Sequence, residues 1–280
     1  MRFYKVHGLG NDFILLDARN RRLDWHRLAP RLCDRHFGIG ADGLLLLEAG
    51  EKAPFKMRII NADGSEAEMC GNGIRCFAKY LADHSYIPAD QDELEVETLA
   101  GIQRLRLIRR GGVVEAVRVG MGRPRLNPAE IPVDLPGPGP IIDYPLTADG
   151  RRLALTFVSM GNPHAVAFLD EPVEAFPLEE VGPKVEHHPL FPRRTNFEAV
   201  NRLAPDHYRV RVWERGVGPT LACGTGACAV AVAARLKGLA PDRVRVELPG
   251  GSLEIEWDGQ GEVLMTGPAA EVFVGEWFED

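Results

Sequence analysis

Long apolar runs are absent from this 280-residue sequence, and none approaches the roughly 20 residues that a helix needs to cross a membrane. The first residues, MRFYKVHGLGNDF, carry charged and polar side chains where a secretory signal would have its apolar centre. There are only five cysteines, an odd number that does not indicate the disulfide framework of a secreted protein. We therefore expect a cytoplasmic protein with reduced thiols and no membrane partner.

An excess of basic residues is missing as well. The chain has 33 Lys and Arg residues against 40 Asp and Glu residues, which gives a formal net charge of -7. Binding to nucleic acids or to anionic membranes needs a basic surface, so we expect no nucleic-acid partner. A composition of 45% hydrophobic and 26% charged residues is typical of a globular protein with one large domain or two of moderate size.

Metal and nucleotide motifs are also lacking. Zinc sites typically use Cys-x2-Cys pairs, whereas five residues separate Cys70 from Cys76 and four separate Cys223 from Cys228. Neither segment has the Gly-x-x-x-x-Gly-Lys-Ser/Thr or Gly-x-Gly-x-x-Gly form of a nucleotide-binding loop. We predict no metal site, and we interpret Cys33, Cys76 and Cys228 as small core residues.

What the sequence does have is an internal repeat. The segments MCGNGIRCFA and LACGTGACAV each place Cys-Gly-x-Gly at the expected start of a helix. Upstream, Gly-Asn pairs at Asn11 and Asn162 precede Cys70 and Cys223 by 59 and 61 positions. A further polar residue lies nine positions before each cysteine, namely Asn61 and Glu214. The repeat predicts an α+β fold of two pseudo-symmetric domains, each a strand-rich layer wrapped around a central helix that begins at a cysteine.

The position of the two cysteines indicates their chemistry. Unpaired N–H groups and aligned peptide dipoles at a helix start favour a thiolate, so we expect the pKa of Cys70 and of Cys223 to be lowered. The glycines that follow allow a carboxylate or phosphate to approach the backbone closely. A thiolate and a thiol beside a bound carboxylate could remove an α-proton and return one from the opposite face. The residues therefore predict inversion of a stereocentre without a cofactor.

At these residues the sequence resembles the diaminopimelate epimerase family, over essentially its whole length. The matching segments are HGLGNDFILLD, FGIGADGLLLL, NADGSEAEMCGNGIRCFAKYL, VSMGNPHAV, RTNFEAVN and VWERGVGPTLACGTGACA. The resemblance implies a homodimer that interconverts a small molecule, LL- and meso-2,6-diaminopimelate, in lysine and peptidoglycan-precursor biosynthesis, with no metal, pyridoxal phosphate or other cofactor. It also implies two domains, residues 1–117 joined by 268–280 and residues 118–267, with the active site in the cleft between them.

The resemblance assigns roles to particular residues. Cys70 and Cys223 correspond to the family's catalytic thiols, with His164 as the partner of Cys70 and Glu214 as the partner of Cys223. The substrate-binding residues that it implies are Asn11, Asn61, Gly71, Asn72, Asn162, Asn196, Glu214, Arg215, Gly224 and Thr225. These residue types suit an amino-acid substrate, because asparagine both donates and accepts hydrogen bonds and arginine offers a planar fork to a carboxylate.

Two alternatives stay open. A proline or hydroxyproline racemase uses a similar cysteine pair, although the asparagines and Arg215 favour a substrate with a polar far end. A non-catalytic amino-acid-binding protein on the same fold would not need both cysteines together with His164 and Glu214. The sequence also departs from the family pattern at two positions: Gly43 replaces a glutamine that contacts substrate in some members, and Pro219 stands where an acidic residue is common.

Overall fold

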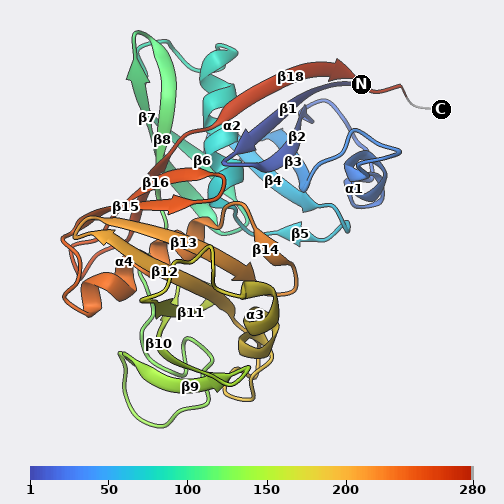
Figure 1. The fold of residues 1–280 in the computed structure, drawn as a ribbon. Coiled ribbons are helices and arrows are strands. Elements are labelled where there is room, and N and C mark those ends of the chain that lie inside the picture. Colours follow the sequence, from blue (N-terminus) through green and yellow to red (C-terminus); the bar gives the residue numbers. More distant parts are fainter. Residues whose placement is uncertain (279–280) are drawn as a thin grey trace. The chain divides into compact units, whose positions relative to one another are not determined.

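The computed structural model describes residues 1–278, and the chain divides into two compact units (Figure 1). The first unit contains residues 1–120 and the C-terminal stretch from Thr266 onward, and the second contains residues 121–265. Each unit combines strands with two helices, so the predicted α+β class is confirmed. No helix among residues 1–278 is long and apolar enough to cross a membrane.

The sheet of the first unit surrounds one helix. Its strands pair in the order β18, β1, β2, β3, β4, β6, β7, β8, and the short β5 pairs with β4. Helix α2 contacts seven of these strands and therefore lies inside the sheet. The bounds are β1 (Arg2–Gly8), β2 (Asn11–Asp17), α1 (Trp25–Cys33), β3 (Gly43–Ala49), β4 (Phe55–Asn61), β5 (Glu66–Ala67), α2 (Gly71–Asp83), β6 (Glu93–Thr98), β7 (Gly101–Arg110), β8 (Val113–Gly120) and β18 (Ala270–Glu276).

The second unit repeats this arrangement. Its strands pair in the order β9, β10, β11, β12, β13, β15, β16, and the short β14 pairs with β13. Helix α4 contacts β10, β11, β12, β15 and β16. The bounds are β9 (Tyr144–Ala148), β10 (Arg151–Ser159), β11 (Pro163–Phe168), α3 (Leu178–Glu186), β12 (Asn196–Ala204), β13 (His207–Glu214), β14 (Gly218–Thr220), α4 (Gly224–Leu236), β15 (Arg243–Leu248), β16 (Gly251–Glu256) and β17 (Leu264–Gly267), which leads back to the first unit.

The internal repeat of the sequence corresponds to the same pairing of strands in both units. In the first unit β2 and β3 are parallel, with Phe13 opposite Gly43. In the second unit β11 and β12 are parallel, with His164 opposite Asn196. The next strand is antiparallel in both units, and the outer helices α1 and α3 pack on corresponding strands. The predicted pattern of a strand-rich layer around a central helix is therefore confirmed in each unit.

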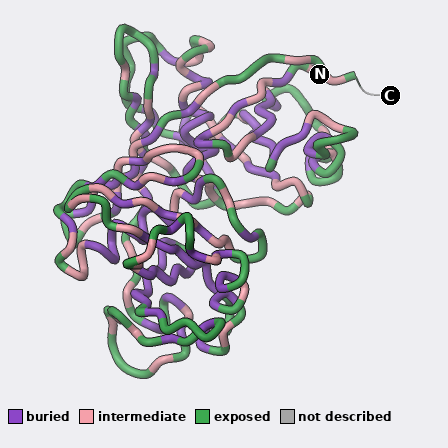
Figure 2. The backbone as a smooth tube through the Cα atoms, viewed as in Figure 1, coloured by how far each residue is buried: buried purple, intermediate pink, exposed green. Residues whose placement is uncertain are grey.

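The composition of the two central helices explains how a sheet can close around them. From Gly226 to Ala234 every residue of α4 is buried, and most of them are alanine or valine. A helix that is apolar on all sides must be covered on all sides, and small side chains let the strands come close. Figure 2 shows that exposed residues, in contrast, occur in connections such as the end of the β7–β8 hairpin. Both central helices begin one residue after the cysteine, which is the N-cap.

Candidate active site

Cys70 is held at the N-terminus of α2 by its backbone conformation. It is the N-cap residue, with the extended dihedral angles φ -139° and ψ 120°, and its sulfur accepts a hydrogen bond from the backbone N–H of Gly73 at 3.5 Å. The thiol also donates to Oδ1 of Asn11 at 3.7 Å. Cys70 is half-buried, whereas the other four cysteines are buried. The structure thus brings the predicted residues Cys70 and Asn11 into contact.

Asn11 is oriented by a carboxylate that sequence reasoning missed. Its Nδ2 donates to Oδ2 of Asp42 at 2.7 Å, and its Oδ1 accepts from Nδ2 of Asn72 at 3.2 Å. An ionised carboxylate can only accept, so Asp42 turns the amide oxygen of Asn11 toward Cys70. The oxygen of Asn72 in turn accepts from the fully buried Arg75 at 2.9 Å.

Asp42 belongs to a charged cluster at the start of β2. Arg35 donates to both Asp12, at 2.7 Å, and Asp42, at 2.8 Å, while Lys5 forms an ion pair with Asp12. Burial would raise the pKa of Asp12, but hydrogen bonds from Arg35 and Lys5 outweigh it and lower the pKa to about 2. The cluster therefore fixes the strand that carries Asn11 through ionised partners.

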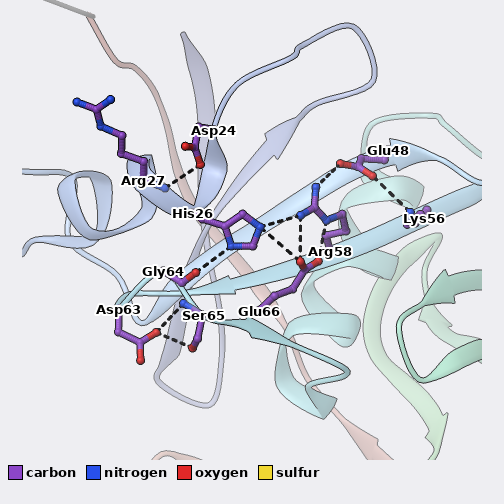
Figure 3. A network of polar contacts seen from close by, with 10 residues as sticks. All are labelled: Asp24, His26, Arg27, Glu48, Lys56, Arg58, Asp63, Gly64, Ser65 and Glu66. Atoms are coloured by element: carbon purple, nitrogen blue, oxygen red, sulfur yellow. Dashed lines mark hydrogen bonds and ion pairs between the residues drawn. The ribbon is translucent and has the colours of Figure 1, made fainter.

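Asn61 ends β4 and lies in a tight turn, in which its backbone N–H donates to the carbonyl oxygen of Ser65 at 2.8 Å. Its Nδ2 donates to Oγ of Ser65 at 2.9 Å. A polar network on β4 and β5 fastens this turn (Figure 3). Arg58 binds Glu66 through two hydrogen bonds, at 2.7 and 3.0 Å, and Nδ1 of His26 lies 2.9 Å from the carbonyl oxygen of Gly64. The network positions the backbone around Asn61.

Cys223 occupies the corresponding place at α4 but in a different environment. Its sulfur accepts from the backbone N–H of Gly226 at 3.3 Å and lies 3.5 Å from Oγ1 of Thr225. Burial and the nearby carboxyl groups of Glu214 and Glu198 raise the pKa of the Cys223 thiol well above its ordinary value. The sequence predicted a lowered pKa, and that expectation was wrong because the cost of burying a thiolate exceeds the effect of the helix N-terminus.

Three other predicted residues of the second unit, His164, Asn162 and Thr225, form a chain of hydrogen bonds toward Cys223. Asn162 donates from Nδ2 to Oγ1 of Thr225 at 3.2 Å, and its Oδ1 lies 3.0 Å from Nε2 of His164. Nδ1 of His164 lies 2.7 Å from Oε1 of Glu198. Glu198 was not singled out from the sequence, although an acidic residue in the apolar strand segment NFEAV was a signal that could have found it.

Asn196, Glu214 and Arg215 lie around the facing ends of β12 and β13. Asn196 donates to the carbonyl oxygen of Pro163 at 2.9 Å and accepts from the backbone N–H of Arg215 at 2.8 Å. The Arg215 guanidinium donates to a backbone carbonyl at 3.1 Å, and the Glu214 carboxylate accepts from the hydroxyl of Thr220. Asn196 is 3% exposed, so its amide also has a structural role in holding the start of β12.

The remaining predicted positions are the two glycines that follow the cysteines. Gly71 and Gly224 are the first residues of α2 and α4, and a Cβ on Gly224 would lie 3.2 Å from the sulfur of Met265. A Cβ on Gly43 would lie 2.8 Å from the carbonyl oxygen of Ile60. The backbone at Gly43 is therefore packed for glycine, and a glutamine there would need β4 to shift. Among residues 1–278 no group of three or more His, Cys, Asp or Glu residues is placed to hold a metal ion.

Comparison with known proteins identifies relatives over nearly the whole chain. The model of the diaminopimelate epimerase family matches residues 3–127 and 156–272. The diaminopimelate epimerase of Moorella thermoacetica is 53% identical over 280 residues, covering 99% of both chains. That of Carboxydothermus hydrogenoformans is 54% identical over 282 residues, covering 99% of this chain and 100% of the relative.

Solved structures share the fold at low sequence identity. A phenazine biosynthesis protein of the PhzF family from Bacillus anthracis has a TM-score of 0.72 at 16% identity, covering 100% of this chain and 99% of that one. A probable proline racemase from Agrobacterium radiobacter has a TM-score of 0.69 at 17% identity, covering 100% and 93%. At this level of identity the structures are evidence of the fold alone.

Proposed function

The chain belongs to the diaminopimelate epimerase family, and from this premise we propose that it converts LL-2,6-diaminopimelate to meso-2,6-diaminopimelate in lysine and peptidoglycan-precursor biosynthesis. One observation supports this activity above the others. Each unit places a cysteine, Cys70 or Cys223, as the N-cap of its central helix. Two thiols at equivalent places in the repeat provide the two groups that inversion of a carbon needs, one to remove a proton and one to supply another.

The thiol chemistry follows from the contacts of each sulfur. We propose that one of Cys70 and Cys223 acts as thiolate base while the other acts as thiol acid, with the roles exchanged for the reverse reaction. Because burial raises the pKa of Cys223, its thiolate is a strong base once formed. The donors at Gly226 and Thr225 can stabilise that thiolate. His164 and Glu214 are the proposed partners that take or orient thiol protons.

Diaminopimelate carries an amino-acid group at each end, and polar side chains are proposed to bind both groups. The N-termini of α2 and α4, at Gly71 with Asn72 and at Gly224 with Thr225, are proposed to hold the carboxylate of the reacting centre, where charge develops when the proton leaves. The amides of Asn11, Asn61, Asn162 and Asn196 are proposed substrate contacts together with Glu214, and Arg215 is proposed to offer its planar fork to the distal carboxylate. A proline-type racemase would not need this polar set.

The proposal includes a cytoplasmic homodimer that needs no cofactor. Strand β18 supports self-association, because Val272, Phe273 and Val274 are each about half exposed along it. In the sheet β18 pairs with β1, and an exposed apolar edge strand is a surface that another chain can cover. Analytical ultracentrifugation of the wild type and of Phe273→Lys tests this, with a dimer expected for the wild type and a monomer for the variant.

Solvent isotope exchange tests the reaction itself. In deuterium oxide we expect label to enter the α-carbon of LL- and meso-diaminopimelate, with Cys70→Ala and Cys223→Ala each abolishing epimerisation. Cys33→Ala is the matched control, because Cys33 lies in α1 with its thiol buried among apolar residues, and burial raises its pKa to about 12. Normal turnover in either of the first two variants would contradict the two-thiol mechanism, and turnover of proline but not of diaminopimelate would support the alternative racemase.

A further inference from the structure

The second unit contains a buried acid beside a buried histidine. Glu198 and His164 have 0% side-chain exposure, and Oε1 of Glu198 lies 2.7 Å from Nδ1 of His164. The second oxygen, Oε2, has no hydrogen-bond partner among residues 1–278. A buried polar atom without a partner is costly and rare in proteins, so this carboxyl group needs an explanation.

The first unit shows which side chains occupy the positions that correspond to His164 and Glu198. His164 takes the place of Phe13, since each is paired with the first residue of the next parallel strand. The first residues of the partner strands are Gly43 in β3 and Asn196 in β12. Two residues later in each strand, Glu198 of β12 takes the place of Leu45 of β3. The first unit thus has an apolar pair where the second has an ionisable pair.

Contacts with the central helices confirm the correspondence. A Cβ added to Gly73, three residues after Cys70, would lie 3.0 Å from Cδ2 of Leu45. A Cβ added to Gly226, three residues after Cys223, would lie 2.9 Å from Oε1 of Glu198. Both side chains therefore pack under the first turn of the central helix of their own unit.

Stability does not account for the ionisable pair. Replacing a buried ion pair by well-packed apolar side chains is often neutral or stabilising. The first unit closes around its helix with Phe13 and Leu45, so the second could do the same. The presence of His164 and Glu198 instead indicates a functional reason.

The hydrogen bonds fix how many protons the pair holds. Asn162 donates to Thr225 through its amide nitrogen, so the amide oxygen faces His164 and can only accept. Nε2 of His164 must then carry a proton. A second proton lies between Nδ1 and Oε1 of Glu198, whether the pair is imidazolium with carboxylate or neutral imidazole with carboxylic acid. In both forms the net charge is zero, which suits complete burial.

The chain continues from His164 to the sulfur of Cys223. Nε2–H donates to Asn162, Asn162 donates to Thr225, and the Thr225 hydroxyl lies 3.5 Å from the sulfur, to which it can donate when the sulfur is a thiolate. The donors of His164 and Asn162 both point along the chain toward Cys223.

We propose that Glu198 is a positioning residue of the epimerase reaction, which through His164 fixes the direction of a hydrogen-bond chain ending on the Cys223 sulfur. This inference rests on the proposed function. The titratable groups that act on Glu198 are His164 and Glu214, and Glu198 acts on Cys223 in turn. Burial raises the pKa of Glu198, which is consistent with a proton held by the pair.

Glu198→Gln tests the inference with little change of shape. The glutamine amide can either donate to Nδ1 of His164 or accept from it, so both ring tautomers become populated and the direction of the chain is lost. We expect kcat to fall by at least about tenfold in both directions with KM within threefold, as for loss of a group that orients a proton-transfer residue. Glu247→Gln is the control, because Glu247 contacts His207 at 3.2 Å in a partly exposed pair on β15 and β13.

Nitrogen-15 NMR of His164 provides a readout that a purely structural role would not change. In the wild type we expect a single state with Nε2 protonated, and in Glu198→Gln a mixture of tautomers. A single Nε2–H state in the variant, or a kcat within twofold of wild type, would overturn the proposal. If the glutamine variant does not fold, Glu198→Asp is measured in the same two ways. An absence of wild-type activity on diaminopimelate would overturn the proposed function while leaving the NMR assignment intact.

A double variant, His164→Phe with Glu198→Leu, gives the second unit the same two side chains that the first unit has at Phe13 and Leu45. We expect it to be inactive and to unfold at a temperature equal to or above that of the wild type. Unfolding more than about 10 °C lower would show that the pair is needed for stability and would overturn the functional interpretation.

Discussion

The ion cluster around Asp12 yields a prediction whose sign and size follow from the structure. Asp12 lies one residue after Asn11, its side chain is 16% exposed, and it pairs with Arg35 and Lys5. The substitution Asp12→Asn keeps the shape and removes the charge. We expect it to lower the free energy of unfolding of the first unit in a way that depends on pH.

The magnitude comes from the pKa of Asp12, which is lowered from 3.8 to about 2. A difference of nearly two units corresponds to about 2 kcal/mol, and screening at Arg35, which is 56% exposed, reduces it toward about 1 kcal/mol. Because the pKa is depressed in the folded protein, this stabilisation is complete above pH 4 and is lost as the pH falls through 2. At pH 3 roughly half of it should remain.

Urea unfolding of wild type and Asp12→Asn at pH 7, 5 and 3 measures this difference. Hydrogen exchange of peptides from β1 and β2 assigns the change to the first unit. A double-mutant cycle with Arg35→Gln should give a coupling of about 1 kcal/mol at pH 7. Equal destabilisation at pH 7 and pH 3, or none at pH 7, would refute the assignment of the stabilising charge to Asp12.

Three further outcomes are expected. Brief treatment with iodoacetamide at pH 8 should modify Cys70 first, because it is the most exposed of the five cysteines, and mass spectrometry showing another cysteine reacting first would contradict this. Asp42→Ala should lower kcat/KM about tenfold by freeing the amide of Asn11 to turn, whereas unchanged kinetics would show that Asp42 does not orient it. Gly182→Ala should destabilise the second unit by about 1–3 kcal/mol, measured by thermal unfolding, because the added Cβ would lie 2.5 Å from the Trp213 ring.

Much of the fold could be predicted because it is repeated. Two copies of Cys-Gly-x-Gly, with Gly-Asn pairs upstream at similar spacing, indicated two similar units before any strand was placed. Strand alternation and the apolar composition of residues 224–236 indicated strands around a buried helix, since such a helix has no face for solvent. The start of each central helix was misplaced by only one residue, because the cysteine is the cap.

The sequence by itself therefore determined which thiols lie at helix starts, because capping and periodicity are local properties of the chain. The tertiary structure decided how those thiols behave. Cys223 has a raised pKa because strands distant in sequence bury it and bring Glu198 and Glu214 near. Asn11 faces Cys70 because Asp42, 31 residues away, accepts from its amide. Burial and electrostatic neighbours depend on which segments meet, and a motif does not contain that information.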